Sequence, residues 1–254
     1  MQVIGCQLDI QWEDKSANHE RVRRLLADVQ VQPGALIVLP EMFATGYSMN
    51  VQVVHEGGAR PTERFCAALA VEHGAYVLAG AVSPDRAGWG RNEAVAFDPS
   101  GELVARYAKM HPMTVAGEAE HYLPGTEVVT FACGEFVVSP FVCYDLRFPE
   151  IFRMAATRGA HVMPVIANWP AVRIAHWRTL LAARAIENQA YVIGVNRTGD
   201  SPEMAYNGRS VVIDPRGETI AEAGEGETAL VADIELEPLL EYRAKFPALA
   251  DRRV

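Results

Sequence analysis

Cysteine is scarce in this chain, with only Cys6, Cys66, Cys133 and Cys143 among its 254 residues. No two of them have the C-x-x-C spacing, so the sequence indicates neither a disulfide framework nor a cysteine-ligated metal site. The opening stretch "MQVIGCQLDIQWEDK" lacks a basic flank and does not have the pattern of a signal peptide. We therefore expect free thiols in a cytoplasmic protein.

Several other classes of protein also lack their signatures here. The seven histidines show no H-E-x-x-H or similar ligand pattern, and no glycine-rich phosphate loop occurs. No apolar run approaches the roughly 18 residues that span a bilayer. The net charge of −9 argues against nucleic acid or an anionic membrane as a partner. Half of the residues are hydrophobic, which is ample for the core of one large domain or two small ones.

Lysine is rare as well, with Lys15, Lys109 and Lys245 against twenty arginines. An ammonium has a tunable pKa that a guanidinium lacks, so a lysine among so many arginines hints at a specific role. Codon bias is the alternative explanation of this ratio.

What is present is an alternation of strands and helices. The predicted helices are Ser16–Val29, Thr62–His73, Pro149–Arg158 and Ala175–Gln189. The predicted strands and hairpins are 2–10, 35–40, 75–82, 91–107, 135–145, 160–168, 190–197 and 207–223.

The second half repeats the order of the first. "AYVLAG" at 75–80 matches "AYVIGV" at 190–195, and "DPSGE" at 98–102 matches "DPRGE" at 214–218. Each half is then a β-α-β-α-β-β unit whose apolar strands need helices on one face and another sheet on the other. Since no linker separates the halves, we expect one α/β domain over 1–254, a four-layer α-β-β-α sandwich.

One cysteine occupies an unusual place in this pattern. In "SPFVCYDLRFPE" (139–150) an apolar strand ends at Cys143, and a polar turn and a helix follow. Such a junction exposes one side chain at the strand tip and aims the first N–H groups of the helix at a ligand. Cys143 is therefore either a small core residue or a nucleophile.

Two further charged residues also follow predicted strands. Glu41 comes after the apolar run "LIVLP", and Lys109 comes after the second strand of the 91–107 hairpin. Ligands of α/β folds bind at strand ends, so both are candidates for a site. A capping carboxylate and a solvated surface amine are the alternative readings.

These motifs together resemble the nitrilase superfamily of carbon–nitrogen hydrolases. The resemblance spans the whole chain. It rests on "LPEMFATGYS", "YAKMHPM", "GEAEHYLPG", "CYDLRFPEIFR", "ANWPAVRIAHWRTLLAARAIENQAYVIGVNR" and "YNGRSVVIDPRGE". It implies a catalytic set of Glu41, Lys109 and Cys143, with Glu118 or the nearby Glu120 as a second glutamate.

The resemblance also implies a mechanism for these residues. Glu41 is the general base, and Cys143 attacks an amide carbonyl to form a thioester. Lys109 and the N–H of Tyr144 stabilise the oxyanion. No metal or organic cofactor is required. We expect Asp145 and Arg147 to form an ion pair that fixes the turn, with contact to the substrate as the alternative.

Within the superfamily the sequence most resembles the bacterial omega-amidase branch, whose substrates are 2-oxoglutaramate and 2-oxosuccinamate. Such substrates carry a carboxylate, and we propose Arg173 as its partner, with a solvated surface position as the alternative. Phe43 and Tyr47 are expected to line the pocket, and Asn168 and Trp169 to border it.

Three alternatives stay open at this point. The first is another hydrolase of the superfamily, such as a nitrilase or a carbamoyl-amine hydrolase. The second is a Cys–His pair with His111 as base, and the third is a non-catalytic binding protein. The resemblance further implies a homodimer that pairs through helices 149–158 and 175–189, where Trp177, Leu180, Leu181 and Ile186 supply apolar surface.

Overall fold

Two β-sheets form the centre of the molecule. The structure is a computed structural model, and it describes residues 1–85 and 88–253. The first sheet has the order β15-β1-β2-β3-β4-β5 and the second the order β14-β13-β10-β9-β7-β6, with β8 paired to β9. The strands of the first sheet are β1 (Gln2–Gln7), β2 (Leu36–Val38), β3 (Tyr76–Pro84), β4 (Gly90–Phe97), β5 (Leu103–Ala108) and β15 (Thr228–Asp233). Those of the second are β6 (Phe131–Cys133), β7 (Phe136–Val138), β8 (Phe141–Val142), β9 (Val162–Ala167), β10 (Tyr191–Asn196), β13 (Val211–Ile213) and β14 (Thr219–Glu222).

The helices connect these strands. They are α1 (Lys15–Ala27), α2 (Val51–Val54), α3 (Pro61–His73), α4 (Pro149–Thr157), α5 (Ile174–Asn188) and α6 (Leu236–Lys245). Short 3₁₀ turns are η2 (Thr114–Ala116), η3 (Glu118–Glu120), η4 (Cys143–Arg147) and η5 (Ala171–Arg173). Local chemistry sets several boundaries: Asp14 accepts from the Ala17 N–H at 2.9 Å to cap α1, and a proline opens both α3 and α4.

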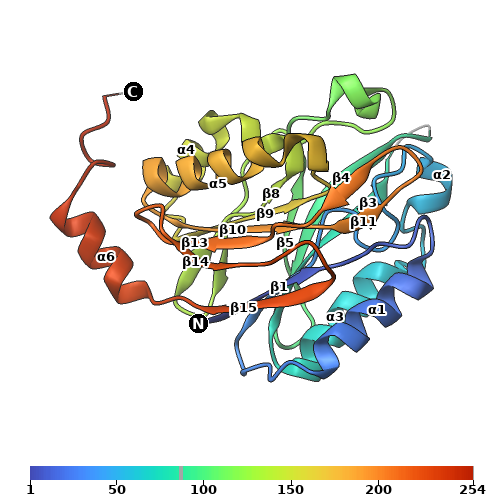
Figure 1. Ribbon diagram of the computed structural model, residues 1–254, viewed down its shortest axis with the longest axis horizontal. Helices are drawn as coiled ribbons and strands as arrows, with labels where there is room; N and C mark the ends of the chain where they lie inside the picture. Colours follow the sequence, from blue (N-terminus) through green and yellow to red (C-terminus); the bar gives the residue numbers. More distant parts are fainter. Residues whose placement is uncertain (86–87, 254) are drawn as a thin grey trace.

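The sheets lie face to face, with α1 and α3 outside the first and α4 and α5 outside the second (Figure 1). The alternation along β2 reflects this arrangement. Leu36 and Val38 belong to the core between the sheets, whereas Ile37 packs with the helices on the outer face. The predicted α/β fold is therefore confirmed, and the layering is consistent with the predicted four-layer α-β-β-α sandwich.

The predicted duplication is visible in the strand order. β1-β2-β3-β4-β5 in one sheet corresponds to β7-β9-β10-β13-β14 in the other, and both halves have parallel strands followed by an antiparallel hairpin. The predicted strand 135–145 is interrupted, because Pro140 has no N–H for the ladder and separates β7 from β8. β6 and β15 are edge strands that the repeat did not predict.

Two apolar residues of α5, for which a core or a subunit-interface position was expected, lie in the core of the chain. Trp177 and Leu181 are fully buried against β10. They fit there because Gly194 has no side chain: a Cβ at Gly194 would lie 2.4 Å from Leu181 Cδ1 and 2.8 Å from Trp177 Cζ2. Ile186, in contrast, is 52% exposed.

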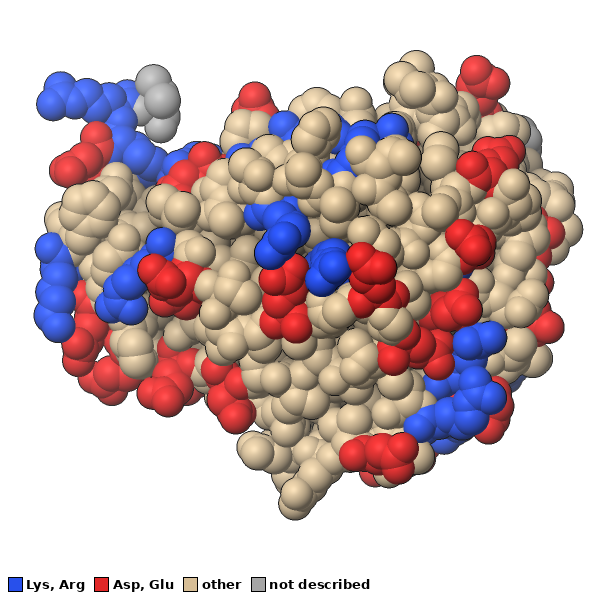
Figure 2. Space-filling model, in the orientation of Figure 1, with Lys and Arg blue, Asp and Glu red and all other residues tan. Residues whose placement is uncertain are grey.

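Charge is mixed on the face of the molecule that Figure 2 shows. Acidic and basic side chains alternate on the face seen in Figure 2, without an extended basic region. α6 runs along one end of the molecule beyond the sheets, and the C-terminal residues continue past it (Figure 1). None of the described helices is long and apolar enough to cross a membrane.

Candidate active site

A pocket of about 120 Å³ opens where several strands of both sheets end. Its lining residues are Tyr47, Lys109, Met113, Val115, Ala116, Cys143, Tyr144, Arg147, Asn168, Trp169, Pro170, Arg173, Met204 and Tyr206. Lys109 directly follows β5, Cys143 follows β8 and Asn168 follows β9, so the strand-end argument brings three separate segments to one cavity.

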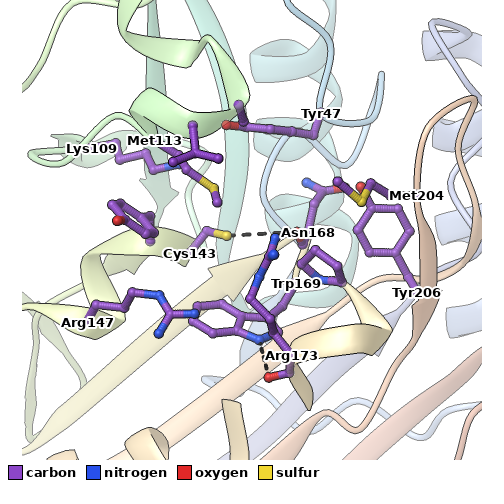
Figure 3. A pocket seen from close by; sticks show the side chains of 14 residues that line it. Tyr47, Lys109, Met113, Cys143, Arg147, Asn168, Trp169, Arg173, Met204 and Tyr206 are labelled. Atoms are coloured by element: carbon purple, nitrogen blue, oxygen red, sulfur yellow. Dashed lines mark hydrogen bonds between the residues drawn. The ribbon is translucent and has the colours of Figure 1, made fainter. Parts of the chain in front are cut away.

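Cys143 lies at a sharp turn between β8 and α4. Its φ of 49° is in the left-handed region, which is costly for a residue with a Cβ and typical of functional turns. The thiol is 7% exposed and donates to the carbonyl of Asn168 across 3.9 Å (Figure 3). Burial, together with the charge of Glu41, raises the pKa of Cys143 well above its ordinary value. The resting side chain is therefore a thiol that requires a base.

Asp145 anchors this turn to the strand that carries Lys109. Its Oδ2 accepts from the Tyr107 hydroxyl at 2.8 Å and from the Val142 N–H at 3.2 Å. Its Oδ1 accepts from the His111 N–H at 3.0 Å and lies 2.8 Å from His111 Nδ1. Tyr107 and His111 stand on either side of Lys109, so one buried carboxylate fixes the distance between Cys143 and Lys109.

The expected ion pair between Asp145 and Arg147 is wrong. Asp145 is fully buried and already accepts hydrogen bonds from the Tyr107 hydroxyl and the His111 N–H. Arg147 instead turns into the pocket, where its guanidinium stacks over the Trp169 ring at 4.8 Å and contacts His176 Nδ1 at 3.3 Å.

Lys109 is buried between two glutamates. Its Nζ lies 3.0 Å from Glu41 Oε1, 2.9 Å from Glu118 Oε1 and 2.8 Å from Glu118 Oε2. Glu118, not Glu120, is the second glutamate of the site, because Glu118 is fully buried against the ammonium and Glu120 is exposed. The Tyr47 hydroxyl and the Met113 N–H also donate to Glu118 Oε2, at 2.9 and 2.6 Å.

The ionisation of this cluster follows from its contacts. Burial acts to lower the pKa of Lys109, but Glu118 and Glu41 raise it well above its ordinary value. Burial acts to raise the pKa of Glu118, yet Lys109 and its hydrogen-bond donors lower it. Lys109 thus keeps a fixed positive charge next to the thiol.

Glu41 is held from the opposite side by Asn168. The Asn168 N–H donates to Glu41 Oε2 at 2.9 Å, and the Asn168 Nδ2 donates to the Glu41 carbonyl at 2.7 Å. Because the Asn168 carbonyl also accepts from the thiol, this one residue links Glu41 to Cys143.

One residue of the cluster escaped sequence reasoning. Asn92 lies in β4, is 1% exposed, and donates from Nδ2 to Glu41 Oε1 at 2.7 Å and to Glu118 Oε1 at 2.9 Å. The only indication in the sequence was that Asn92 is a polar residue within the apolar strand "GRNEAVAF". A polar residue there is as compatible with the solvent-facing edge of a sheet as with a functional site.

The predicted pocket residues divide into two groups. Tyr47, Asn168, Trp169 and Arg173 line the cavity. The prediction for Phe43 is wrong: its ring is fully buried on the outer face of the first sheet, 6.1 Å from the ring of Phe65. The loop after Glu41 turns back at Met42, whose φ is 44°, and this turn directs Phe43 away from the cavity.

His111 is engaged elsewhere. Its ring stacks on Phe148 at 3.7 Å and contacts Asp145, and it is not among the residues that line the pocket. This arrangement disfavours a Cys–His pair. Glu41, in contrast, interacts directly with the Cys143 thiol, through its charge and a side-chain hydrogen bond.

Met204 and Tyr206 were also missed. They belong to a two-stranded ribbon of β11 (Thr198–Asp200) and β12 (Ala205–Asn207) that lies outside both sheets and reaches one wall of the cavity. Over residues 1–85 and 88–253, no group of three or more His, Cys, Asp or Glu side chains could hold a metal ion.

The sequence has close relatives among characterised proteins. A family model described as carbon-nitrogen hydrolase matches residues 4–244. The chain is 33% identical to the 2-oxoglutaramate amidase of Bacillus subtilis, over 98% of this chain and 97% of that protein. It is 40% identical to omega-amidase YafV of Yersinia enterocolitica, over 96% of this chain and 94% of that protein.

The fold is likewise shared with solved structures. A carbon–nitrogen hydrolase superfamily protein from Xanthomonas campestris, which holds an arsenic adduct in its active site, matches with a TM-score of 0.93. The two chains are 31% identical, with 100% of this chain and 97% of that one covered.

Proposed function

The chain belongs to the carbon–nitrogen hydrolase family and hydrolyses carbon–nitrogen bonds, and from this premise we propose that it is an omega-amidase-like enzyme. Its substrates are 2-oxo dicarboxylic acid monoamides such as 2-oxoglutaramate and 2-oxosuccinamate, which it converts to the 2-oxo acid and ammonia. Glu41, Lys109 and Cys143 carry the chemistry, and Glu118 and Tyr144 support it.

The first half of the reaction forms a thioester. Glu41 takes the thiol proton while Cys143 Sγ bonds to the amide carbon, and the carbonyl oxygen becomes an oxyanion. Lys109 and the Tyr144 N–H stabilise that charge, since the N–H groups of the first turn of η4 have no partners inside the helix. The carbon–nitrogen bond then breaks, and the proton held by Glu41 moves to the leaving nitrogen to give ammonia.

The second half returns the enzyme to its resting form. Water enters the pocket, Glu41 removes a proton from it, and the hydroxide adds to the thioester carbon. The carbon–sulfur bond breaks, the acid leaves, and the proton returns to the Cys143 sulfur. Both halves use the same base and the same oxyanion donors, so no cofactor takes part.

Two arginines in the pocket carry the substrate assignment. Arg147 and Arg173 both line the cavity, and neither forms an ion pair with a carboxylate of the described residues. Unpaired guanidiniums in the pocket of a chain with net charge −9 favour an anionic ligand. The Trp169 Nε1–H donates to the Arg173 carbonyl at 2.8 Å and orders η5, and Arg147 stacks on the same indole, so Trp169 orients both cations (Figure 3).

A comparison of charged and neutral amides tests this assignment. For Arg147→Ala and Arg173→Ala we expect KM for 2-oxoglutaramate to rise roughly 10- to 150-fold, which corresponds to about 1.5–3 kcal/mol for a hydrogen bond to a charged group. Turnover of butyramide, which has no carboxylate, should change little. Arg178→Ala is the control, because Arg178 lies on α5 outside the pocket and pairs with Glu222 at 3.0 Å.

Ammonia release is measured with each amide for all four proteins. An equal loss on both substrates would mean that the arginines support the fold only. Faster hydrolysis of simple nitriles or carbamoyl amines than of 2-oxoglutaramate by the unaltered enzyme would replace the omega-amidase proposal by another activity of the family.

Three further features complete the proposal. The chain forms a single carbon–nitrogen hydrolase domain, supported by one family match over 4–244 and by a core shared between the sheets. It acts in the cytoplasm, which fits four free cysteines. It pairs as a homodimer through the α4 and α5 side.

A further inference from the structure

The two glutamates of the site share their donors in an unusual way. Glu41 Oε1 and Glu118 Oε1 both accept from Asn92 Nδ2, at 2.7 and 2.9 Å, and both contact Lys109 Nζ, at 3.0 and 2.9 Å. The four atoms form a closed ring of two acceptors and two donors. The main chain reinforces it, because the Lys109 N–H donates to the Asn92 carbonyl at 2.8 Å.

Lys109 alone cannot both hold this ring and serve the reaction. An ammonium has three N–H groups, and Lys109 has contacts with three carboxylate oxygens, one from Glu41 and two from Glu118. Stabilising an oxyanion requires one of these N–H groups to turn toward the substrate. When it turns, Glu41 Oε1 and Glu118 Oε1 lose part of their attraction to the Lys109 ammonium, which offsets the repulsion between the two carboxylates.

Asn92 is suited to replace that contribution. Its amide has two N–H donors in a fixed plane, one for each oxygen, and it brings no charge into a buried cluster. Asn92 is 1% exposed and does not line the pocket, so it cannot touch substrate. The two glutamates depend on it alike: the Oε1 of each has Asn92 and Lys109 as donors, while the Oε2 of Glu118 is held by Tyr47 and Met113 and the Oε2 of Glu41 by the Asn168 N–H.

We propose that Asn92 is a positioning residue that keeps Glu41 and Glu118 in place while Lys109 turns an N–H to the oxyanion. This inference rests on the proposed roles of Glu41 as base and Lys109 as oxyanion donor. Loss of the amide leaves the Glu41 carboxylate with one donor fewer, which disfavours its charged form.

The test is the pH dependence of 2-oxoglutaramate hydrolysis by Asn92→Ala and Asn92→Ser. We expect the acidic limb of kcat/KM to move up by about one to two pH units in Asn92→Ala. Asn92→Ser keeps one donor and should shift about half as far. At neutral pH kcat should fall at least tenfold in Asn92→Ala, with less than a threefold change in KM, because Asn92 does not touch substrate.

Asn188→Ala is the matched control. Asn188 is equally buried and its Nδ2 also donates to an oxygen, the Arg184 carbonyl at 3.0 Å, but it lies on α5 away from the glutamates. This variant should lose stability on thermal unfolding and keep the unaltered pH profile. A fall in kcat for Asn92→Ala with an unmoved acidic limb would overturn the proposal. If Asn92→Ala does not fold, an unmoved limb in Asn92→Ser overturns it equally.

Glu41→Gln separates this inference from the proposed function. If Glu41→Gln is inactive and the Asn92 variants show no shift, the base is correctly assigned and only the role of Asn92 fails. If Glu41→Gln retains turnover, the proposed mechanism fails, and the role of Asn92 fails with it.

Discussion

Two residues next to the reacting groups have left-handed backbone angles although neither is glycine. Met42 follows the proposed base Glu41 with φ 44°, and Cys143 itself has φ 49°. Each such residue costs of order 1–3 kcal/mol, so the surrounding contacts must hold both turns in place. Asn168 does so for Glu41, and Asp145 does so for the turn that carries Cys143. The strain lies where the thiol and its base must face one cavity.

The lysine is sensitive to the shape of its replacement as well as its charge. Lys109 Nζ is 1% exposed and has three oxygens within 3.0 Å, a geometry that a larger planar guanidinium cannot reproduce. For Lys109→Arg we expect kcat/KM to fall on the order of 100-fold or more. Lys15→Arg, which changes a partly exposed lysine paired with Glu56, should leave activity unchanged. Near-normal kinetics in Lys109→Arg would contradict the oxyanion role.

A histidine outside the site predicts how stability depends on pH. His19 on α1 stacks on Phe65 at 4.2 Å, and its Nε2 is buried without a partner. Burial lowers its pKa from 6.5 to about 4. Between pH 6.5 and 4, His19 is therefore protonated in the unfolded chain but largely neutral in the folded chain. The free energy of unfolding falls as pH drops from about 6.5 to 4.

Replacing this ring with one that cannot titrate should remove that dependence. In His19→Phe we expect a smaller loss of unfolding free energy between pH 7 and pH 5 than in the unaltered protein, measured by urea denaturation. Identical losses in the two proteins would show that His19 is not the group responsible.

At the level of single residues, the sequence predicts which reactive side chains follow strands, but it does not predict the hydrogen bonds that hold those side chains in place. Glu41, Lys109 and Cys143 stood out because each follows an apolar strand. The roles of Asn92 and Asp145 depend on partners 51 and 38 positions away in the chain, such as Glu41 and Tyr107. Such pairs form only when sheets meet, so no local pattern encodes them.

The elements around the base meet at a point where only glycine fits. The loop that carries Glu41 crosses strand β3 at Gly80. A Cβ on that residue would lie 2.3 Å from the Met42 nitrogen and 2.6 Å from the Glu41 Cα. Since both neighbours are backbone atoms, they cannot yield without moving Glu41, the proposed base.

Gly80→Ala should therefore damage the fold and the site together. We expect a loss of about 1–3 kcal/mol in unfolding free energy, the usual range for overpacking, and a fall in activity of about 100-fold from displacement of Glu41. Gly58→Ala is the control, because a Cβ there meets nothing within 4 Å. An active, stable Gly80→Ala would mean that the loop can shift without cost.

The elements also explain which parts of the fold were predictable. Both repeats, the hairpins and the four long helices follow from alternating and 3.6-residue patterns, which are local. The ribbon of β11 and β12 has no such signal: its two three-residue strands are too short for a period to be read. The pocket wall that contains Tyr206 was invisible in the sequence for that reason.

For the whole molecule, the repeated order of elements gives two corresponding helical layers, α1 with α3 and α4 with α5, whose exposed surfaces differ. β15 closes the first sheet by pairing with β1 from Gln2↔Asp233 to Gln7↔Thr228, a contact between the two ends of the chain that no repeat predicts. The chain then leaves the sheets as α6, in which only Leu239 is buried. The C-cap residues of the two helices are in contact, since Gln189 Nε2 after α5 donates to the Phe246 carbonyl after α6 at 2.8 Å. Four large apolar side chains are exposed on α4, α5 and the α6 segment, namely Met154, Ile186, Leu240 and Phe246.

This asymmetry predicts which layer pairs. Ile186 on α5 follows Val71 on α3 by 115 positions, the offset that separates "AYVLAG" at 75–80 from "AYVIGV" at 190–195. The two side chains are similarly exposed, 52% and 56%, and each contacts the glycine of the hairpin in its own half, Gly217 and Gly101. Ile186 lies toward the end of α5 that contacts the α6 segment, where Leu240 and Phe246 are also exposed, so we expect the two-fold interface on this side. Light scattering at micromolar concentration should give a dimer for the unaltered protein and for Val71→Asp, and a monomer for Ile186→Asp. A dimer that survives Ile186→Asp and dissociates in Val71→Asp would place the interface on the α1 and α3 layer instead.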